Sequence, residues 1–405
     1  MQKKTFKAGV LWLHRWLGLI SGLVVVVVSV TGCLFVFQKE INRWVRADLR
    51  SVDTATQTER AEGARPRLPL EELQRRAADT LGVERLAYGL TTFGDPGRTW
   101  KAFTFQYGEP TWTYFGSIKE YETAYIDPYT GEVAGVVDEE RDFFQVVKAL
   151  HWSLLLATPI GQPIVVWATV VFVVLLVSGL ILWWPRWWNR RERRRSFRVR
   201  WKATLYRLNY DLHNVLGFYA LVVALIIALT GFYWAFPVAK KSLYFLGTGE
   251  YRLPPESQQQ VQSEPVPSPG SGQSGSPLEA AYAKAWGEYP GAHRITFTSP
   301  APSDSQGTIQ ATVYRDGGVY YGKSHLQFDR YTGELLHNAP YSQKNAGEKL
   351  LEMNYDIHVG AIGGLPGKLI AFLASLISAS LPVTGFIIWW KKKRKGKSSR
   401  LKAES

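Results

Sequence analysis

The chain has 405 residues, of which 46% are hydrophobic and 14% aromatic, and its formal net charge is +14 at pH 7. The basic excess is confined to three short segments, residues 1–15, 185–202 and 391–405, so the remainder of the chain is net acidic. Nucleic acid is therefore not an expected partner, because these segments border long apolar runs instead of forming one patch. Cys33 is the only cysteine, so an intramolecular disulfide is excluded.

Four uncharged apolar runs predict an integral membrane protein. They span Leu17–Phe37, Ile164–Trp184, Val215–Phe236 and Leu369–Trp390. Because a helix needs roughly 20 residues to cross a hydrocarbon layer of about 30 Å, each run predicts one transmembrane helix, and membrane lipid is an expected partner. Basic flanks stay in the cytoplasm, so the sequence predicts a multi-pass protein with both termini cytoplasmic and its longer polar regions outside.

The runs divide the chain into segments. In order, the predicted segments are transmembrane helix 1 with a cytoplasmic N-terminus (1–37), a first outside domain (38–145), an outer histidine segment with transmembrane helix 2 (146–186), a basic cytoplasmic loop (187–207), transmembrane helix 3 (208–237), a second outside domain (238–350) with a flexible loop (254–277), an outer histidine segment with transmembrane helix 4 (351–390), and a basic cytoplasmic tail (391–405).

Four of the seven histidines begin apolar segments that end in Thr-Gly or Ser-Gly followed by aromatic residues. These segments pair His14 with Thr31-Gly32, His151 with Ser178-Gly179, His213 with Thr230-Gly231, and His358 with Thr384-Gly385. Cys33 follows Thr31-Gly32 as in a lipoprotein cleavage box, but the other three segments have the same pair without a cysteine. We therefore interpret the pair as a helix-packing motif.

The two halves of the chain indicate a tandem duplication. His14 and His151 recur in the same order as His213 and His358, and Pro69-Leu70-Glu71 recurs as Pro277-Leu278-Glu279. Each outside region predicts a short helix, Leu70–Leu81 or Leu278–Trp286, and β structure, Trp100–Tyr107 or Thr308–Tyr314. Tight turns are predicted at Asp127–Glu132 and Asp329–Glu334, where Asp opens the turn and Gly takes the positive-φ position.

These features resemble a known family. The Asp-Pro-Tyr-Thr-Gly-Glu turn at Asp127–Glu132, with its helix and strands, resembles the PepSY domain. The four histidine-headed segments resemble the PepSY-associated transmembrane family of bacterial inner-membrane proteins, which includes ferric-siderophore reductases that bind haem. The resemblance implies an α-helical integral membrane protein with α+β outside domains: four transmembrane helices in two tandem repeats, each with a periplasmic PepSY-like domain.

The histidine positions predict two haem sites. Parallel repeats place matched residues at the same depth, so His14 and His213 are expected together near the cytoplasmic face, and His151 and His358 near the outer face. Two matched imidazoles can hold one haem iron from both sides. We therefore expect these four histidines to be the axial ligands of two haem b groups per chain.

Six glycines are expected beside the haem groups, because glycine permits close approach of a helix or a macrocycle. They are Gly18, Gly217, Gly32, Gly231, Gly179 and Gly385. Gly32 and Gly231 are expected near the outer histidines, and Gly179 and Gly385 near the inner ones. Plain helix packing through small residues is the alternative explanation.

The outer histidines are followed by helix breakers. Pro159 and Pro163 follow His151, and Gly363, Gly364 and Pro366 follow His358, so a broken or bent helix is expected at each. Asp211 and Asp356 each lie two residues before a histidine, and this spacing predicts first-turn charges rather than partners of the imidazoles. A zinc site is a competing interpretation of the histidines, although zinc requires three or four clustered ligands.

The resemblance implies a haem-dependent oxidoreductase. The expected function is a di-haem b reductase that takes electrons from a cytoplasmic reductant or quinol donor and passes them to a ferric siderophore or other periplasmic electron acceptor, releasing Fe(II). No catalytic side chain is identified. The alternative function is a non-enzymatic membrane scaffold or transport accessory whose PepSY-like domains bind a peptide or a partner.

Overall fold

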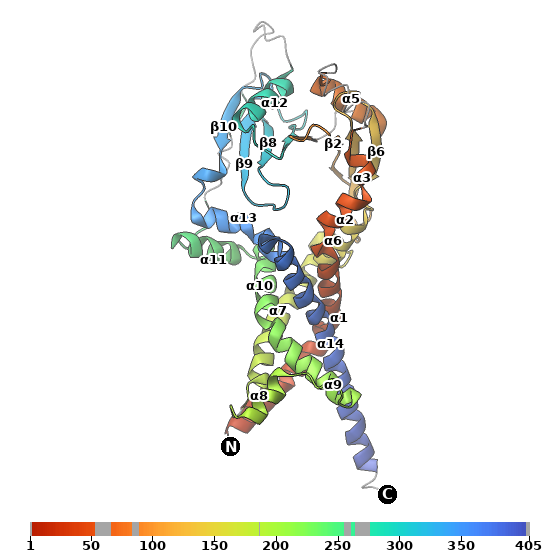
Figure 1. Ribbon diagram of the computed structural model, residues 1–405, viewed down its shortest axis with the longest axis vertical. Coiled ribbons are helices and arrows are strands. Elements are labelled where there is room, and N and C mark those ends of the chain that lie inside the picture. The colour runs from red at the N-terminus through yellow and green to blue at the C-terminus, as the bar shows by residue number, and fades with distance from the viewer. Residues whose placement is uncertain are drawn as a thin grey trace.

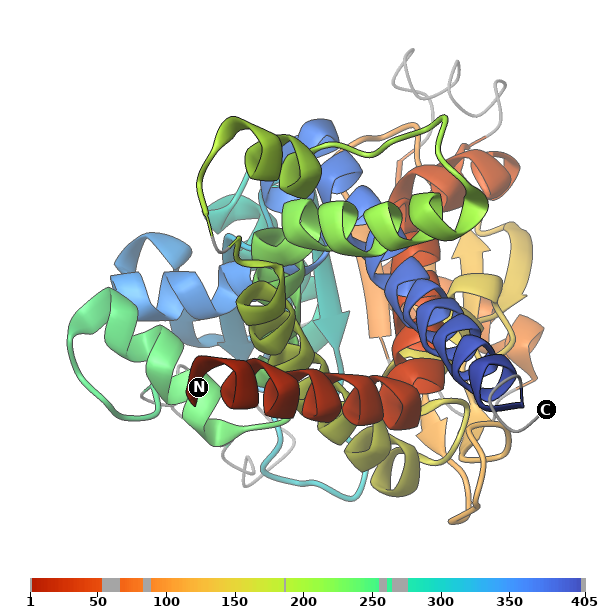
Figure 2. The same cartoon turned by 90° about the horizontal axis from the view of Figure 1, so that it is seen from below.

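The computed structural model describes residues 2–52, 66–82, 89–185, 187–254, 261–263 and 276–401. The molecule is elongated, with a bundle of long helices at one end and a β-sheet at the other (Figure 1). Both termini lie at the end of the bundle remote from the sheet, and the view from that end shows them apart from one another (Figures 1 and 2).

Long apolar helices build the bundle. They are α1 (Gln2–Val36), α7 (Thr158–Trp183), α9 (Leu205–Asp211) continuing through a π-helical turn (Leu212–Leu216) into α10 (Gly217–Gly231), and α14 (Gly364–Leu401). Within the described residues, four stretches are long and apolar enough to cross a membrane, Phe6–Val36, Thr158–Trp183, Leu205–Trp234 and Ala361–Lys393. Large apolar side chains on their outer surfaces, such as Ile20 at 77% and Leu23 at 76% exposure, suit lipid rather than water. The four predicted membrane helices are confirmed.

The two outer histidines lie on short helices separate from the long ones. Helix α6 (Phe143–Ser153) precedes α7, and Leu154 and Leu155 between them have positive φ of 57° and 61°. Helix α13 (Ala346–His358) precedes α14, and Gly360 between them has φ of 74°. Residues other than glycine rarely adopt such φ values, which do not occur within an α-helix. These junctions are therefore the helix breaks that the prolines and glycines predict.

An eight-stranded antiparallel sheet forms the other end of the molecule, in the order β10-β9-β8-β7-β1-β2-β5-β6. From the N-terminal half come β1 (Gly89–Phe93), β2 (Trp100–Phe103), β5 (Glu122–Ile126) and β6 (Val133–Asp138), and from the C-terminal half β7 (Arg294–Thr298), β8 (Ile309–Tyr314), β9 (Lys323–Phe328) and β10 (Leu335–Ala339). Helices α5 (Leu70–Leu81) and α12 (Pro277–Glu288) cover one face, where Leu73, Leu90, Ile295 and Phe297 join one hydrophobic core.

The sequence does not anticipate that this sheet is continuous. Two outside domains are expected, but β1 pairs antiparallel with β7 along five residues, from Gly89 opposite Thr298 to Phe93 opposite Arg294. In the middle of this seam, Thr91 lies opposite Thr296 with their Oγ1 atoms 3.0 Å apart. Each half therefore closes an edge strand of the other, which removes two exposed sheet edges.

The predicted turns are confirmed. Asp127 Oδ1 accepts hydrogen bonds from the backbone N–H groups of Tyr129 and Thr130 at 2.7 and 3.1 Å, and Gly131 has φ of 72°. The second turn repeats this geometry, with Asp329 as the acceptor and Gly333 at φ of 73°.

Several predicted segments differ in detail from the structure. The β region 100–107 is two strands, β2 and β3 (Gln106–Tyr107), of which β3 pairs with β4 (Ile118–Glu120) outside the main sheet. Residue 350, the expected end of the second outside domain, lies inside α13, and the expected tail 391–405 continues helix α14 as far as Leu401. The expected flexible loop 254–277 lies mostly outside the described residues. Other α-helices of the described residues are α2 (Gln38–Val45), α3 (Ala47–Arg50), α8 (Arg190–Phe197) and α11 (Pro237–Thr248).

Candidate functional site

The four histidines meet in two pairs inside the bundle. The ring centroids of His14, on α1, and His213, in the π-helical turn, are 6.4 Å apart with an interplanar angle of 88°. Those of His151, on α6, and His358, at the end of α13, are 6.2 Å apart at 75°. The structure thus brings together the residues that the sequence pairs, at two separate places.

The helices that carry the outer histidines have well-defined starts. Asp142 caps α6 by accepting hydrogen bonds from the N–H groups of Phe144 and Gln145, and its carboxylate also binds Arg46 at 2.6 Å. Asn345 and Glu348 form a capping box at the start of α13. Such caps fix where a helix begins, and hence the direction in which His151 and His358 project.

Each imidazole is held by a hydroxyl group on a neighbouring helix. The Nδ1 atom of His14 lies 2.8 Å from Ser178 Oγ, and Nδ1 of His213 lies 2.9 Å from Thr384 Oγ1. In the outer pair, Nδ1 of His151 lies 3.1 Å from Thr31 Oγ1 and Nδ1 of His358 lies 3.0 Å from Thr230 Oγ1. The four partners are the Thr or Ser residues of the Thr/Ser-Gly pairs, which the sequence assigns only to packing.

These contacts determine which ring nitrogen carries the proton. The Thr31 hydroxyl donates to the backbone carbonyls of Val27 and Val28, and His151 Nδ1 also lies 2.9 Å from the carbonyl oxygen of Val28. Since a carbonyl can only accept, His151 Nδ1 must donate its hydrogen. His358 has the equivalent contact, at 3.0 Å, with the carbonyl of Ile227. The Nε2 lone pairs of both outer histidines are therefore free to bind a metal ion.

The glycine of each pair lies beside the same imidazole. A Cβ atom added at Gly179 would lie 3.4 Å from His14 Cε1, and one at Gly385 would lie 3.2 Å from His213 Cε1. At Gly32 and Gly231 the corresponding distances, to His151 and His358, are both 3.5 Å. The Thr/Ser-Gly pair is thus a seat for a histidine, in which the hydroxyl group orients the ring and the glycine lies beside it. Only at Gly385 would an added Cβ atom be closer than ordinary van der Waals contact.

The other two predicted glycines have a different role. A Cβ atom at Gly18 would meet Leu175 at 3.8 Å, and one at Gly217 would meet Leu381 at 3.3 Å. Both therefore allow helices to pack closely and do not touch a histidine ring, although both line the inner cavity.

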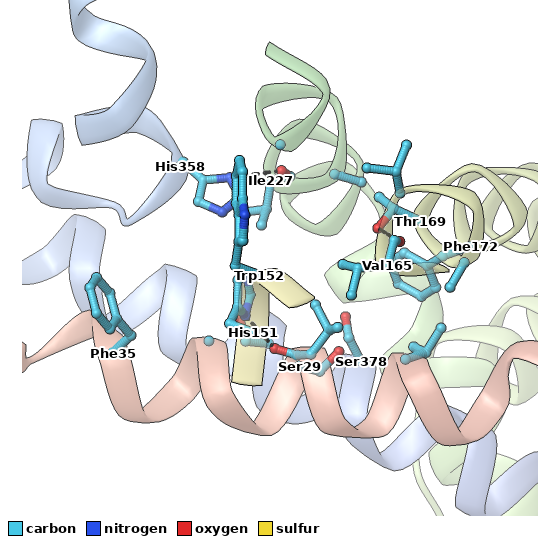
Figure 3. A pocket seen from close by; sticks show the side chains of 18 of the residues that line it. Ser29, Phe35, His151, Trp152, Val165, Thr169, Phe172, Ile227, His358 and Ser378 are labelled. Carbon is cyan, nitrogen blue, oxygen red and sulfur yellow. Dashed lines mark hydrogen bonds between the residues drawn. The ribbon is translucent and has the colours of Figure 1, made fainter. Parts of the chain in front are cut away.

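A cavity accompanies each histidine pair. The inner cavity has a volume of about 620 Å³ and the outer one, around His151 and His358 (Figure 3), about 330 Å³. Ligand sites usually occupy roughly 300–1,000 Å³ and are mostly apolar. Val25 and Phe172 line both cavities, so single side chains separate the two sites. Arg15 lines the inner cavity, and its buried Nε atom has no hydrogen-bond partner within the described chain.

The spacing of the rings suits one metal ion between each pair. Two imidazoles that bind a metal from opposite sides, with bonds of about 2 Å and ring centres roughly 1.1 Å beyond each nitrogen, have centroids roughly 6 Å apart. The observed separations of 6.4 and 6.2 Å agree with this arrangement. Within the described residues, no three His, Cys, Asp or Glu side chains gather in a way that could hold a metal ion, so the geometry does not support a zinc site.

The two aspartates are not first-turn charges, although, as predicted, their partners among the described residues do not include an imidazole. Asp211 is the last residue of α9 and pairs with Arg200 and Arg207 at 3.2 and 2.8 Å, while Asp356, near the end of α13, accepts hydrogen bonds from the N–H groups of Tyr320 and Tyr321. Both carboxylates are almost fully buried. They fix loops onto the helices that carry His213 and His358 instead of acting as first-turn charges.

Two asparagines were missed at the sequence level. Asn209 and Asn354, four residues before His213 and His358, donate to the backbone carbonyls of Thr384 and Thr230 at 3.0 and 3.1 Å. Each asparagine therefore binds the residue whose hydroxyl holds the nearby histidine. The available signal was the repeated Asn-Tyr-Asp-Leu-His and Asn-Tyr-Asp-Ile-His sequence.

Similarity of this chain to known proteins is found at the level of a family. No curated protein matches the chain. Residues 11–392 match the family described as the PepSY-associated TM region, and the chain belongs to that family of membrane proteins.

Proposed function

We propose that the protein is a di-haem b oxidoreductase of the bacterial inner membrane that passes electrons to a ferric siderophore in the periplasm. The observation that carries the proposal is the pairing of four histidines at 6.4 and 6.2 Å, each with its Nδ1 atom held by a neighbouring Thr or Ser. Such anchoring is typical of metal-binding histidines.

The residues around each pair fit a haem group. His14 and His213 would hold the inner haem, and His151 and His358 the outer one. The four seat glycines lie beside the rings, and the walls are largely apolar. Arg15 and Lys392, which line the inner cavity, supply positive charge for the carboxylate groups that haem carries.

When bound, haem supplies reversible one-electron Fe(II)/Fe(III) chemistry. Two histidines on each iron leave no open coordination position, which favours electron transfer over oxygen chemistry. The hydrogen bonds at Nδ1 fix both rings and raise their basicity as ligands. Val25 and Phe172 line both cavities, so single apolar side chains lie between the two sites.

The distribution of charge supports the proposed orientation in the membrane. The basic segments 1–15, 185–202 and 391–405 flank the bundle at the end where both termini lie, which supports a cytoplasmic location for that end (Figure 1). The sheet would then stand in the periplasm above the outer histidine pair. The donor would be a cytoplasmic reductant or a quinol, and the acceptor a ferric siderophore, whose reduction releases Fe(II).

Purified protein tests the proposal. We expect about two haem groups per chain and a Soret band that shifts on reduction with dithionite. Mixing the reduced protein with ferric siderophores should reoxidise the haem groups while a chromogenic chelator traps Fe(II). A colourless preparation made with adequate haem supply would contradict the proposal and favour a scaffold or transport accessory. Reoxidation only by a different acceptor would contradict the siderophore assignment alone.

A further inference from the structure

Within the described residues, α5 and α12 cover one face of the eight-stranded sheet, and on the opposite face the short helix α3 packs at the β6 end, where Leu49 lies against Gly135. Along β7, Ile295 and Phe297 are buried in the core beneath those helices, so the alternating Arg294 and Thr296 lie on the opposite face. Arg294 pairs with Phe93 across the seam between β7 and β1. A cationic side chain therefore stands on this face where the two halves of the chain join.

Further basic residues gather around this position. The guanidinium of Arg98 lies 3.9 Å from the centroid of the Phe93 ring, and that of Arg294 lies 3.9 Å from the Tyr314 ring. Arg50 is adjacent, because its carbonyl oxygen accepts from Thr99 N at 3.2 Å. We call Lys39, Arg50, Arg98, His293 and Arg294 the seam cluster.

The remaining two members connect the seam to the start of the outside region. The ring of His293 packs edge-on against Phe93 with centroids 6.3 Å apart. Lys39, on α2, donates to the carbonyl of Gly318 at 2.9 Å, and a Cβ atom at the neighbouring Gly317 would lie 2.8 Å from His293 Nε2. The cluster is thus one contiguous group contributed by both halves of the chain.

Among the described residues, the arginines of the cluster form no salt bridge. Nearby Arg46, in contrast, binds Glu139 and Asp142 at 2.9 and 2.6 Å. Burial, with the charges of Arg50 and Arg294, lowers the pKa of Arg98, but a guanidinium remains charged at neutral pH. Like charges held together in a half-buried place are unfavourable unless an anion joins them.

The cluster lies against the wall of the outer cavity. Lys39 Nζ is 3.4 Å from the centroid of the Tyr320 ring. The Tyr320 ring in turn packs against the Tyr355 ring, and the two centroids are 4.6 Å apart. Tyr355 and Trp234 line the outer cavity, and the Trp234 ring lies 5.4 Å from that of His358. A ligand on the cluster is therefore separated from the outer histidine pair by a short aromatic wall.

We propose that the seam cluster binds Fe(III) chelates of net negative charge, such as tris-catecholates, and that the protein selects these over neutral tris-hydroxamate chelates. The guanidinium groups would face the ligand oxygens of the chelate. The aromatic rings beside the guanidinium groups would face the flat surfaces of the chelate. Reduction of the bound Fe(III) chelate rests on the proposed function, whereas binding of the chelate does not.

Gallium(III) chelates test the binding step alone, because Ga(III) matches the charge and shape of Fe(III) complexes but is not reduced under these conditions. The test variant is Arg98→Gln with Arg294→Gln. The control variant, Arg141→Gln with Lys284→Gln, removes the same charge from exposed positions outside the cluster. Binding of the tris-catecholate and tris-hydroxamate complexes to the whole protein in detergent is measured by calorimetry at two salt concentrations.

We expect the cluster variant to weaken binding of the anionic complex about tenfold or more, the control variant to leave it unchanged, and added salt to weaken binding to wild type. The neutral complex should bind weakly to all forms. Arg98→Lys with Arg294→Lys keeps the charge and should retain most of the affinity, which separates charge from packing.

Equal binding of the anionic complex to the cluster variant and wild type would overturn the inference, as would equal weakening of both chelate classes in a folded variant. If Ga(III) tris-catecholate binds as expected but no ferric siderophore reoxidises the haem groups, the siderophore assignment fails and the site stands. If ferric chelates are reduced irrespective of their charge, the proposed function stands and charge selection fails.

Discussion

At the scale of single residues, the four histidines form two pairs in the bundle, and the proposed function requires both members of each pair. Replacing His14 or His213 with alanine removes one of the two imidazoles at the inner cavity, and replacing His151 or His358 does the same at the outer one. We expect the haem content to fall from about two to about one per chain in each variant, because one side-chain ligand rarely holds haem b as well as two.

The spectrum should reveal which haem is lost. His14→Ala and His213→Ala should remove the same spectral component, and His151→Ala and His358→Ala the other. His337→Ala is the control, because His337 lies on β10, far along the chain from every seat motif. Loss of the same component in His14→Ala and His151→Ala would show that the pairs are assigned wrongly.

Gly385 tests the seat of a histidine. An alanine Cβ atom at this position would lie 3.2 Å from His213 Cε1, which is tighter than ordinary van der Waals contact. We expect Gly385→Ala to tilt the ring and lower the affinity for the inner haem roughly tenfold, the scale seen when support of a metal ligand is lost. Gly287→Ala, whose Cβ atom would meet nothing within 4 Å, is the control. Haem titration of the apoprotein measures both.

The pH dependence of ligand binding follows from Lys39. Burial, with the nearby charges of Arg294 and Lys368, lowers the pKa of Lys39 to about 8, against the opposing effect of Asp356 and Glu40. Below pH 8 the ammonium is charged and attracts an anionic ligand. As the pH rises through 8 it loses its proton, so affinity for Ga(III) tris-catecholate should fall.

Lys39→Arg provides the control for this pH dependence, because arginine keeps its charge throughout this range. Its affinity for the anionic complex should stay constant between about pH 7 and pH 9. A wild-type profile that is equally flat would show that Lys39 does not face the ligand.

At the scale of elements, the junction between α6 and α7 holds the outer histidine in position. The two helices meet so closely that a Cβ atom at Gly161 would lie 1.9 Å from the carbonyl oxygen of Ser153. Gly161→Ala must therefore move α6, which carries His151. We expect a loss of stability of about 1–3 kcal/mol and an altered outer haem spectrum with an unchanged inner one.

Gly9→Ala serves as the matched control for this junction, since Gly9 also lies in a helix but its added Cβ atom would meet nothing within 4 Å. Thermal unfolding and the reduced-minus-oxidised spectrum are the measurements. An inner haem altered as strongly as the outer one by Gly161→Ala would show that the junction does not act on His151 alone.

At the scale of the whole molecule, the sequence predicts what depends on local pattern. Apolar runs of about 20 residues predict the four membrane helices. The equivalent positions of His14 and His213 in the two halves of the chain predict that these two residues lie together. The Asp-Gly spacing of Asp127–Glu132 gives the turn. The role of the hydroxyl group in the Thr/Ser-Gly pairs was not predicted, because this group binds a histidine on another helix, as Thr31 binds His151.

The sheet seam could not be predicted for a similar reason. Strand β1, Gly89–Phe93, is short and has no strict alternation of apolar and polar residues, and its partner β7 lies about two hundred residues away in the chain. Edge strands pair through backbone groups that every residue possesses, so side chains specify the register only weakly. Because the seam cluster depends on that register, the sequence did not predict the cluster either.

The seam and the orientation of the molecule can be tested together. Thr91 and Thr296 lie opposite one another, with their Oγ1 atoms 3.0 Å apart, so a cysteine at each position is close enough for a disulfide. Disulfides persist in the periplasm but not in the cytoplasm. In a Cys33→Ser background, which removes the only native cysteine, we expect Thr91→Cys with Thr296→Cys to form this disulfide in intact cells, detected by mass spectrometry after thiols are blocked. The pair Thr91→Cys with Thr123→Cys, on β1 and on the non-adjacent β5, is the control and should remain reduced.

If the Thr91 and Thr296 cysteines stay reduced in cells but join when membranes are treated with an oxidant, the sheet lies in the cytoplasm and the proposed orientation is wrong. If they fail to join under both conditions, the two halves are not paired along this seam.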